Sequence, residues 1–501
     1  MEFWFILIAF LCFCMLIIMR AFPSNIPLPP GPFHLPIISN ILLLRKPFSE
    51  LEPILRNLHA KHGPIITFNF WNGPHIFIVD PSIAHQALIQ KGAIFADRPK
   101  ILCNSDQLNI SSSSYGPTWR VLRRNLASVM LHPSRLKSFS NTRKRVLNDL
   151  LNQLKYDAES CNAIKVMDHL QHAMFSLLVF MCFGERVDEH YITHIKGIQR
   201  RLILNSSRFT ILNFFPTPVA RVLFRKRWQE FWHLRKAQKH VLSELIEARK
   251  QNLESRKNND IDNDECAVCY VDTLLDLQLP EEKRKLNEGE IVNLCSEFLS
   301  AGTDTTSTTL EWVMANMVKN THEQQRVVEE IEGVVGGRGK REVTEEDVMK
   351  LPYLKAVILE VLRLHPPTHF AIPHGVTEDV VLNGFLVPKK GTVNFLLAEM
   401  GWDPKVWEDP MAFKPERFSR GDQKALFDIS GRKEIKIMPF GAGRRICPAY
   451  NLAMLHLEYF VANLVWNFEW KKTSLDVDLS EKQEFTMVIK HPVQALVSPR
   501  F

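Results

Sequence analysis

The chain opens with an uninterrupted apolar run from Phe3 to Met19, and Arg20 follows directly. Its seventeen residues, at about 1.5 Å each in a helix, just reach across a thin hydrocarbon core. A cleaved signal peptide would have a basic start, a shorter apolar run and a small-residue cleavage site, whereas this chain has Glu2 at its start. The run therefore predicts a retained transmembrane anchor over residues 1–20, with the body of the protein on the cytoplasmic side.

Prolines cluster immediately downstream of this anchor. Residues 26–32 read IPLPPGP, and clustered prolines favour a stiff, extended backbone. We interpret residues 21–36 as a hinge that fixes the angle between the anchor and one large body at residues 37–501. An arbitrary proline-rich loop is the simpler alternative, but it explains less.

In the first half of the body, the period of apolar positions changes from strand-like to helical. Two short runs at 65–71 and 75–79 are separated by Asn-Gly-Pro and predict two strands joined by a turn. Residues 82–250 are mostly helical in period and are broken by prolines. Residues 249–265 hold so few apolar side chains that they predict a solvated loop.

In the second half, a long helix is predicted from about 288 to 319, because Asn287 and Glu290 have the spacing of a capping box. Shorter helices are predicted at 322–335 and 353–365, a β-rich stretch at 370–400 and an irregular stretch at 402–446. The last helix, at 449–466, is apolar on nearly all sides and is expected to be buried. The predicted class is mainly α with a minor β region.

Composition and charge narrow the class of protein. The chain has 501 residues, of which 46% are hydrophobic and 23% charged, so its length allows about three domains or one large body that encloses a sizeable cofactor. Its 62 basic and 55 acidic residues give a net charge of +7, which is too mild to indicate nucleic acid binding and suits a membrane surface or an acidic protein partner. Nine cysteines, an odd number, argue against a disulfide framework and indicate a reducing compartment.

One of these cysteines lies in an informative segment. Residues 440–449 read FGAGRRICPA, which places Cys447 one or two residues before the last predicted helix and Pro448 in its first turn. The helix start, together with Arg444 and Arg445, is expected to lower the pKa of the thiol. The two glycines let the backbone pass close to something bulky. The segment describes a nucleophile or a metal ligand, and a buried structural cysteine is the plain alternative.

The residues around Cys447 argue against several kinds of site. A cysteine-phosphatase loop needs an arginine shortly after the cysteine, and the sequence after Cys447 is PAYNLA. Zinc and iron–sulfur sites need about four nitrogen or sulfur ligands, which no neighbouring Cys or His supplies. A single thiolate as the sole protein ligand suits haem iron.

At Phe440, Gly443, Arg445 and Cys447 the segment resembles the cysteine-ligand loop of the cytochrome P-450 family, the haem-thiolate monooxygenases. The resemblance implies that Cys447 is the axial ligand of the iron of haem b (iron protoporphyrin IX). Ala449 stands where the family usually has glycine. Its extra methyl group is tolerated by a helical backbone, so it bears on fine tuning and not on the ligand.

A second motif, AGTDTT at residues 301–306, lies inside the long predicted helix. Glycine and threonine each cost about 0.5–1 kcal/mol relative to alanine in a helix, so their presence favours a special use or a packing accommodation. Small residues let a flat ligand lie against the backbone, and hydroxyls that bond back to carbonyls can admit water. The motif matches the family's oxygen-activation motif, which implies that Asp304 and Thr305 are catalytic residues that deliver protons.

Glu360 and Arg363 lie three residues apart in the predicted helix at 353–365. A surface ion pair is the ordinary interpretation, but the apolar residues around them predict burial, and a buried pair needs further partners. The resemblance implies a second arginine, which is Arg417 in Pro-Glu-Arg-Phe. We expect these three residues to have a structural role.

Trp119 and Arg123 lie four residues apart on a predicted basic helix, a pattern that by itself indicates packing. The resemblance implies that they bind the haem propionates through the indole N–H and the guanidinium group. His374 and Arg445 match two further propionate contacts. For His374, a core histidine with ordinary hydrogen bonds is an equal alternative.

The resemblance spans nearly the whole chain, and details such as Gly-Trp-Asp-Pro at 401–404 look like plant microsomal members. It implies a cytochrome P-450 fold and a monooxygenase in the endoplasmic reticulum membrane. Such an enzyme inserts one oxygen atom from O₂ into a lipophilic small molecule, with electrons from an NADPH-cytochrome reductase. The glycine-rich stretch at 333–340 fits no phosphate- or dinucleotide-binding fingerprint. The rivals are a haem-thiolate isomerase or dehydratase without a reductase and a non-catalytic haem-binding protein.

Overall fold

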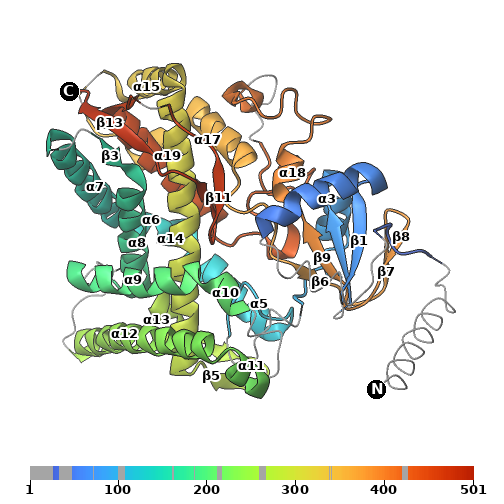
Figure 1. Ribbon diagram of the computed structural model, residues 1–501. Helices are drawn as coiled ribbons and strands as arrows, with labels where there is room; N and C mark the ends of the chain where they lie inside the picture. The colour runs from blue at the N-terminus through green and yellow to red at the C-terminus, as the bar shows by residue number, and fades with distance from the viewer. Residues whose placement is uncertain are drawn as a thin grey trace.

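A computed structural model describes residues 26–32, 48–70, 73–99, 108–160, 163–184, 187–210, 217–258, 267–337, 339, 341–419, 427–474 and 476–501. Figure 1 shows a large helical part beside a smaller sheet-containing part. The mainly α class with a minor β region is confirmed. The predicted anchor at residues 1–20 lies outside the described residues.

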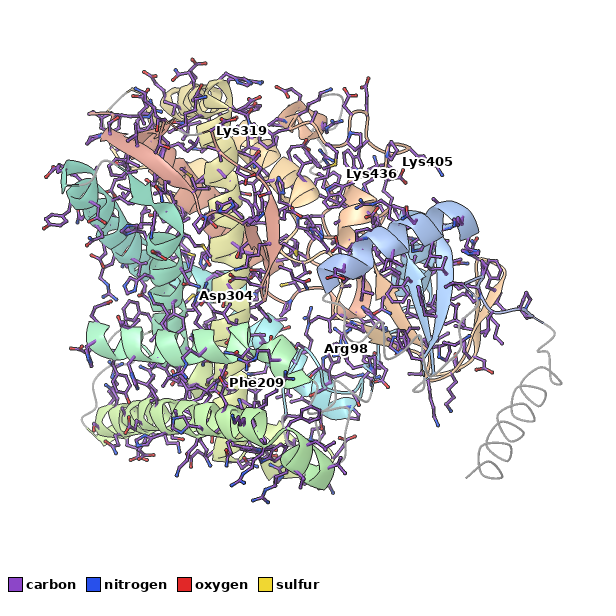
Figure 2. All side chains as sticks on the ribbon, viewed as in Figure 1. Arg98, Phe209, Asp304, Lys319, Lys405 and Lys436 are labelled. Atoms are coloured by element: carbon purple, nitrogen blue, oxygen red, sulfur yellow. The ribbon has the colours of Figure 1, made fainter. Side chains whose placement is uncertain are left out.

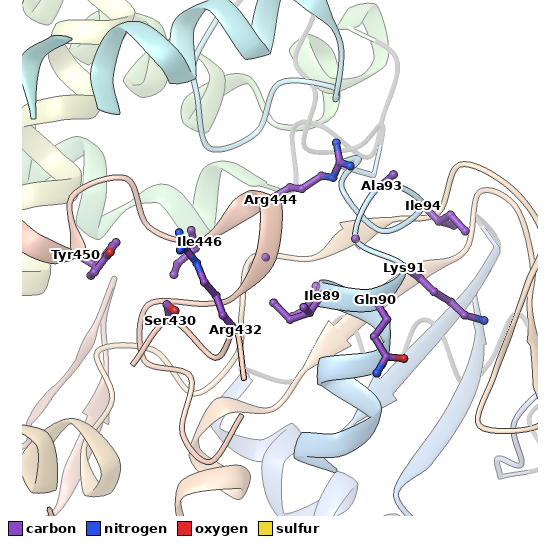
Figure 3. A pocket seen from close by; sticks show the side chains of 13 residues that line it. Ile89, Gln90, Lys91, Ala93, Ile94, Ser430, Arg432, Arg444, Ile446 and Tyr450 are labelled. Atoms are coloured by element: carbon purple, nitrogen blue, oxygen red, sulfur yellow. The ribbon is translucent and has the colours of Figure 1, made fainter. Parts of the chain in front are cut away.

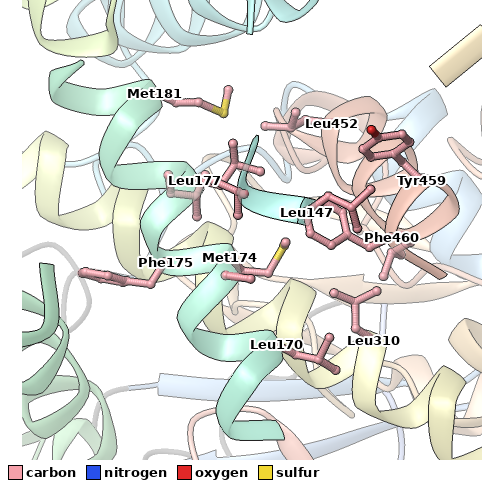
Figure 4. Packing of buried hydrophobic residues seen from close by; sticks show 14 of the residues in the cluster. Leu147, Leu170, Met174, Phe175, Leu177, Met181, Leu310, Leu452, Tyr459 and Phe460 are labelled. Atoms are coloured by element: carbon pink, nitrogen blue, oxygen red, sulfur yellow. The ribbon is translucent and has the colours of Figure 1, made fainter. Parts of the chain in front are cut away.

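The long helix α14 (Glu288–Lys319) runs through the middle of the helical part (Figure 1). Its capping box is confirmed: the Asn287 side chain accepts from Glu290 N at 3.0 Å, and Glu290 Oε2 accepts from Asn287 N at 2.8 Å. It packs along α8 (Val166–Phe183), the one described helix that is long and apolar enough to cross a membrane. Most of α8 is buried in the core between α7, α14 and α19, as Figure 4 shows for Leu170, Met174 and Leu177.

Other helices surround α14. Those at α15 (Thr321–Val335), α17 (Pro352–Leu364) and α19 (Tyr450–Asn467) agree with the predictions to within about a residue. The remaining longer helices are α7 (Ser140–Ser160), α9 (Glu189–Leu204) and α12 (Arg225–Asn258). Shorter ones are α4 (Pro81–His85), α5 (Pro117–Arg124), α6 (Pro133–Ser138), α10 (Ser206–Thr210), α11 (Thr217–Leu223), α13 (Tyr270–Leu275) and α16 (Glu345–Val348), with π-helical turns at η1 (Gln86–Gln90) and η2 (Asn125–Met130).

The loop predicted at residues 249–265 is wrong in its first part, because α12 continues to Asn258. Lysine, arginine and glutamate are good helix formers, so a polar stretch does not by itself end a helix. Arg249 also points inward and makes a double hydrogen bond with Asp272, at 2.8 and 2.6 Å. Residues 259–266 lie outside the described residues.

The main sheet has the strand order β1 (Ile65–Phe70), β2 (Gly73–Ile78), β9 (Thr392–Phe395), β6 (His374–Gly375). β2 pairs parallel to β9 and the other neighbours are antiparallel, so the sheet joins the first hundred residues to the predicted β-rich stretch. That stretch also holds the hairpin of β7 (Val380–Leu382) and β8 (Phe385–Val387). The helices α3 (Phe48–His62) and α18 (Leu397–Gly401) lie beside the sheet (Figure 1).

The described part of the proline-rich segment, residues 26–32, lies against this sheet. Pro30 O accepts from Thr67 N in β1, and Pro27 O accepts from Leu386 N in β8, both at 2.9 Å. Because proline has no N–H, the segment uses its carbonyl groups to join the sheet. The chain therefore enters the body along the sheet.

The C-terminal residues form two further small sheets. β10 (Phe468–Lys472), β13 (Gln494–Pro499) and β3 (Ile164–Lys165) make one, and the hairpin of β11 (Glu481–Gln483) and β12 (Met487–Ile489) makes the other. β4 (Gln278–Leu279) and β5 (Arg284–Lys285) pair before α14. As predicted, the described residues of 402–446 are irregular, with short 3₁₀ turns at η5 (Pro415–Phe418) and η6 (Gly443–Arg445).

Candidate active site

The Cys447 loop is a tight backbone turn between η6 and α19. Cys447 N donates to Phe440 O at 2.8 Å, and Gly441 and Gly443 adopt left-handed conformations with φ of +68° and +69°. A Cβ on Gly443 would lie 2.1 Å from Leu88 O in η1, so the bulky neighbour that this glycine accommodates is another stretch of backbone. α19 begins at Tyr450, which places Cys447 three residues before the helix and not one or two as predicted.

The predicted lowering of the Cys447 pKa is wrong for the protein alone. Burial raises the pKa of the thiol above its ordinary value, and the Ala449 N–H and the charge of Arg123 offset this only in part. The helix start lies too far along the chain to dominate. The raised pKa means that a thiolate here requires a positive partner, and a coordinating metal ion deprotonates a thiol outright. The residue Cys447 is partly exposed. Among the described residues, no group of three or more His, Cys, Asp or Glu side chains is placed to hold a metal ion.

The structure gathers three of the four predicted propionate-binding residues. Arg445 lies over the Trp119 ring, with 4.3 Å from its guanidinium carbon to the ring centre, and it donates to Ala96 O at 2.6 Å and Ser113 O at 2.7 Å. The Trp119 indole N–H donates to Ile110 O at 3.0 Å. The charge of Arg445, with that of Arg98, also lowers the pKa of His374. Arg123 lies apart from this group, donates to Ile446 O and faces Cys447.

His374 is buried, and its Nδ1 lies 2.7 Å from Phe95 O. Burial and the charges of Arg98 and Arg445 lower its pKa to about 3, so it is neutral at pH 7. Phe95 O can only accept, so the single proton of the neutral ring sits on Nδ1. His374 can therefore donate to a carboxylate from Nε2 only by taking a second proton, which a nearby carboxylate favours.

Two functional candidates were missed by sequence reasoning. Arg98 is 5% exposed and donates to Ser111 O at 2.7 Å and to Ile372 O and Pro373 O at 2.9 Å each. Glu297 in α14 accepts from the backbone N–H groups of Ile110 and Ser111, both at 2.7 Å. The loop at 109–113 is thus held on one side by Glu297 and on the other by Arg98, Trp119 and Arg445. The available signal was weak: Glu297 lies among apolar residues one turn before the AGTDTT motif, and Arg98 lies between Asp97 and Pro99.

The hydroxyl groups of the threonine-rich segment bond back to carbonyls, as predicted. Thr305 Oγ1 donates to Ala301 O at 2.7 Å, and Thr303 and Ser307 make similar bonds. Ala301 is exposed and Thr305 is partly exposed, whereas the helix from Thr306 to Val318 is buried. Gly302 serves helix packing, because a Cβ there would lie 2.7 Å from Cδ1 of Leu178 in α8. The accessible surface for a ligand is therefore the strip of Ala301 and Thr305.

The structure does not point Asp304 along that strip. Its carboxylate accepts from Gln171 Nε2 in α8 and from Arg200 Nη1 in α9, both at 3.0 Å (Figure 2 places Asp304 midway along α14). Burial raises the pKa of Asp304, although Arg200 and Gln171 oppose the shift. Consecutive residues of a helix face different sides, so the acid and the Thr305 hydroxyl are adjacent in sequence but directed apart.

Glu360, Arg363 and Arg417 form a buried cluster, which we name the Glu360 cluster. Arg363 donates to both carboxylate oxygens of Glu360 at 2.7 Å, and Arg417 Nε lies 3.3 Å from Glu360 Oε1. Arg363 also donates to Gly401 O at 2.7 Å and Pro410 O at 2.6 Å. The predicted burial is confirmed, with Glu360 0% and Arg363 1% exposed, and the cluster fastens α17 to the irregular stretch that leads to Cys447.

An open surface pocket of about 520 Å³ lies between η1 and the Cys447 loop. Lys91, Arg432 and Arg444 lie around it, together with Ile446 and Tyr450 (Figure 3). The pocket is therefore basic and shares its wall with the residue that precedes Cys447.

Comparison with known proteins identifies the family of the chain. The family model "Cytochrome P-450" matches residues 29–498. Cytochrome P-450 89A9 of Arabidopsis thaliana is 48% identical over 99% of this chain and 98% of its own length. Geraniol 8-hydroxylase of Catharanthus roseus is 31% identical over 94% of both chains, and 5-epiaristolochene 1,3-dihydroxylase of Nicotiana tabacum is 28% identical over 98% and 97%.

Solved structures show the same fold. A zebrafish cytochrome P-450 solved with progesterone covers 91% of this chain and all of its own, with a TM-score of 0.72 at 22% identity. The family match, the plant relatives and this fold agree with one another. The chain belongs to the cytochrome P-450 family and is a haem-thiolate monooxygenase.

Proposed function

We propose that this protein is a membrane-anchored enzyme that inserts one oxygen atom from O₂ into a lipophilic small molecule. The observation that carries this proposal is Cys447, a partly exposed residue in a glycine-shaped loop closed by the bond from Cys447 N to Phe440 O. Two relatives named as hydroxylases of geraniol and 5-epiaristolochene support the reaction class and an apolar substrate. The complete Asp304-Thr305 pair and these hydroxylases favour it over an isomerase, a dehydratase or a non-catalytic haem protein.

The residues of the site fit haem. Cys447 would ligate the iron through its sulfur, and Ala301 and Thr305 would border the haem. Trp119, Arg123, His374 and Arg445, joined by Arg98, would hold the propionates, because buried guanidinium groups neutralise carboxylates. When bound, the haem supplies the iron at which O₂ is activated.

Asp304 and Thr305 would move protons. The raised pKa of Asp304 allows it to carry a proton, and its contacts with Gln171 and Arg200 hold it between α8 and α9. Because Thr305 is directed to the accessible strip, a water molecule or a rotation of Asp304 has to connect the two groups. We expect Asp304→Asn to lower the substrate-dependent rate by about 10²- to 10⁴-fold. Asp157→Asn, which alters a carboxylate 3.1 Å from His169 Nε2, is the control and is expected to leave the rate unchanged.

Electrons would come from an NADPH-cytochrome reductase that docks on the basic pocket of Lys91, Arg432 and Arg444. Residues 1–20 would anchor the protein in the endoplasmic reticulum membrane, with residues 21–36 as hinge and 37–501 as one catalytic domain on the cytoplasmic side. The attachment of residues 26–32 to β1 and β8 supports a fixed angle between anchor and body. The mild charge of +7 supports partners at a membrane and not nucleic acid.

The test uses the full chain reconstituted with haem, membrane lipid and a plant reductase. Reduction under carbon monoxide is expected to give the absorbance shift of a thiolate-ligated ferrous carbonyl, which Cys447→Ala should abolish. Spectral binding is screened against geraniol and a lipophilic extract, and hits are assayed for NADPH-dependent oxygen insertion. A wild-type protein without the carbonyl shift, or turnover of a hit without reductase, would contradict the proposal.

A further inference from the structure

Four ionisable side chains from distant parts of the chain form a nearly buried series, which we name the His369 network: Glu52, His369, Glu481 and His365. His369 Nδ1 lies 2.7 Å from Glu52 Oε1, and His369 Nε2 lies 3.0 Å from Glu481 Oε2 at ion-pair distance. His365 Nδ1 lies 2.8 Å from Glu481 Oε1. The side chain of His369 is 4% exposed, and its two carboxylate partners are 18% and 19% exposed.

The network joins three elements. Glu52 is in α3 beside the main sheet, His365 and His369 flank the segment that follows α17, and Glu481 begins β11. Main-chain contacts mark the same junction, because Met487 N donates to Pro367 O and Leu397 N donates to His369 O. The network therefore places two carboxylates and two histidines at the junction of the sheet-containing part and the helical part of the molecule.

The hairpin of β11 and β12 reaches from this junction to the oxygen-activation segment. At its tip, Thr486 Oγ1 lies 2.9 Å from Thr308 Oγ1, which is one helical turn beyond Thr305. Beside the tip, Met487 O accepts from the Trp312 indole N–H at 2.8 Å, and the Trp312 ring stacks on His365 with 3.9 Å between ring centres. A shift of Glu481 would therefore be transmitted to α14 at Thr308 and Trp312, one to two turns beyond the accessible strip.

Only the doubly protonated ring of His369 can serve both carboxylates, because a neutral imidazole has one N–H. The groups that face His369 are Glu52 from α3, Glu481 from β11 and, beyond Glu481, His365; Trp402 contributes an uncharged edge at 5.2 Å. Further along α3, Arg56 pairs with Glu399 of α18 at 2.6 Å. Burial lowers the pKa of His369, but the two carboxylates outweigh it and raise the pKa to about 9, while the histidines lower the pKa of Glu481 to about 2.

We propose that His369 is a positioning residue for the substrate pocket: as a cation shared by Glu52 and Glu481, it fixes the hairpin and the 365–370 segment relative to each other. The inference rests on the proposed function, because it assumes that these segments border the substrate. The expected consequence is that the protein discriminates between ligands by their size. Large ligands that touch the hairpin should depend on the network, whereas small ligands at the iron should not.

The sign of the pH dependence follows from the raised pKa. The contribution of His369 is complete below its ordinary value near 6.5 and is lost as the pH rises through about 9. The lowered pKa of Glu481 keeps that carboxylate charged over this range. The preference for large ligands should therefore decline on the alkaline side.

The experiment uses the full-length holoprotein and two probes that both bind haem iron, imidazole and the bulky azole clotrimazole. Spectral dissociation constants are measured at pH 7 and pH 9.8 for wild type, His369→Gln, His369→Lys and Glu52→Gln. Each variant is compared with wild type at the same pH, so that titration of the azoles cancels. His240→Gln is the matched control, because it removes a His–Glu pair at 3.1 Å whose histidine is 70% exposed.

We expect His369→Gln to weaken clotrimazole about tenfold at pH 7 and to leave imidazole binding unchanged. At pH 9.8 wild type should approach the variant, His369→Lys should retain part of the preference, and Glu52→Gln should show a smaller loss. Equal effects on both azoles, or a clotrimazole constant for His369→Gln that equals wild type at pH 7, would overturn the inference. If wild type itself shows no azole spectrum, the proposed function fails and not this inference alone.

Discussion

The Glu360 cluster and the His369 network solve the same structural problem with different chemistry. Each is buried, and each fastens the residues at or near α17 to an irregular or hairpin segment. In the Glu360 cluster the cations are arginines, which keep their charge at every ordinary pH and also donate to backbone carbonyls. In the His369 network the cation is an imidazole whose charge depends on its neighbours.

The difference matches what each region holds. The Glu360 cluster fixes the stretch that leads to the Cys447 loop, where the position of one sulfur atom matters. The His369 network fixes a hairpin that reaches toward the threonine-rich part of α14. A permanent charge suits the fixed position of the sulfur atom. A titratable charge makes the strength of the hairpin contact depend on pH.

The largest effect is expected for Arg363→Gln. Removing one partner of a buried ion pair leaves Glu360 without its main counter-charge and costs about 3–5 kcal/mol. Urea unfolding of the holoprotein measures it, with Lys471→Gln as an exposed ion-pair control. A loss below about 1 kcal/mol would make the cluster equivalent to a surface pair.

His369→Gln should show a pH-dependent loss of stability. Because the pKa of His369 is raised to about 9 from an ordinary value near 6.5, the difference from wild type should be about 3 kcal/mol at pH 6 and should disappear by pH 10. The free energy of unfolding of both proteins across this range is the measurement. A constant difference from pH 6 to pH 10 would show that the ring packs without acting as a cation, and the contrast between the two clusters would not hold.

Loss of Glu297 should have an effect of intermediate size, because its carboxylate accepts hydrogen bonds from backbone N–H groups and, within the described residues, does not pair with another charge. Glu297→Ala leaves the N–H groups of Ile110 and Ser111 without their acceptor, which we expect to cost about 1–3 kcal/mol. The freed loop should also speed the transfer of haem to apomyoglobin, because Arg98, Trp119 and Arg445 grip the same loop. Glu297→Gln keeps one acceptor and should fall between Glu297→Ala and wild type. Glu288→Gln, at the exposed start of α14, should transfer haem at the wild-type rate.

The smallest effect is expected for Arg417→Lys. Arg417 is 3.3 Å from Glu360 and also donates to Asp409 O at 2.8 Å, and a lysine keeps the charge but loses the second contact. We expect a loss of about 1 kcal/mol at pH 7. Urea unfolding of Arg417→Lys and Arg363→Gln compares the contributions of the two arginines to the free energy of unfolding. Equal losses for the two variants would show that both arginines contribute equally.

The sequence predicts those features whose cause is local. The capping box at Asn287, the strands around residue 72 and the apolar helix after Cys447 depend on residues within a few positions of one another, and the structure confirms them. The sequence predicts the end of α12 too early, because a polar stretch can continue a helix and the inward contact of Arg249 with Asp272 is not visible in the pattern.

The parts that escaped prediction depend on distant partners. Arg98 meets carbonyls 274 residues away, Glu297 meets a loop 187 residues away and His369 meets Glu52 across 317 residues. A chemical identity can be assigned to such residues from the sequence, but their partners cannot. The pKa of Cys447 shows the same limit, since burial and not the nearby helix start decides its direction.

The close approach of Gly443 to Leu88 sets the distance between the Cys447 loop and η1. With φ of +69° at residue 443 and only 2.1 Å between a would-be Cβ and Leu88 O, the Cys447 loop rests directly on the main chain of η1. The separation between the Cys447 loop and η1 is thus determined by the thickness of a peptide backbone, which is the same for every amino acid. Any side chain at residue 443 would push the Cys447 loop and η1 apart.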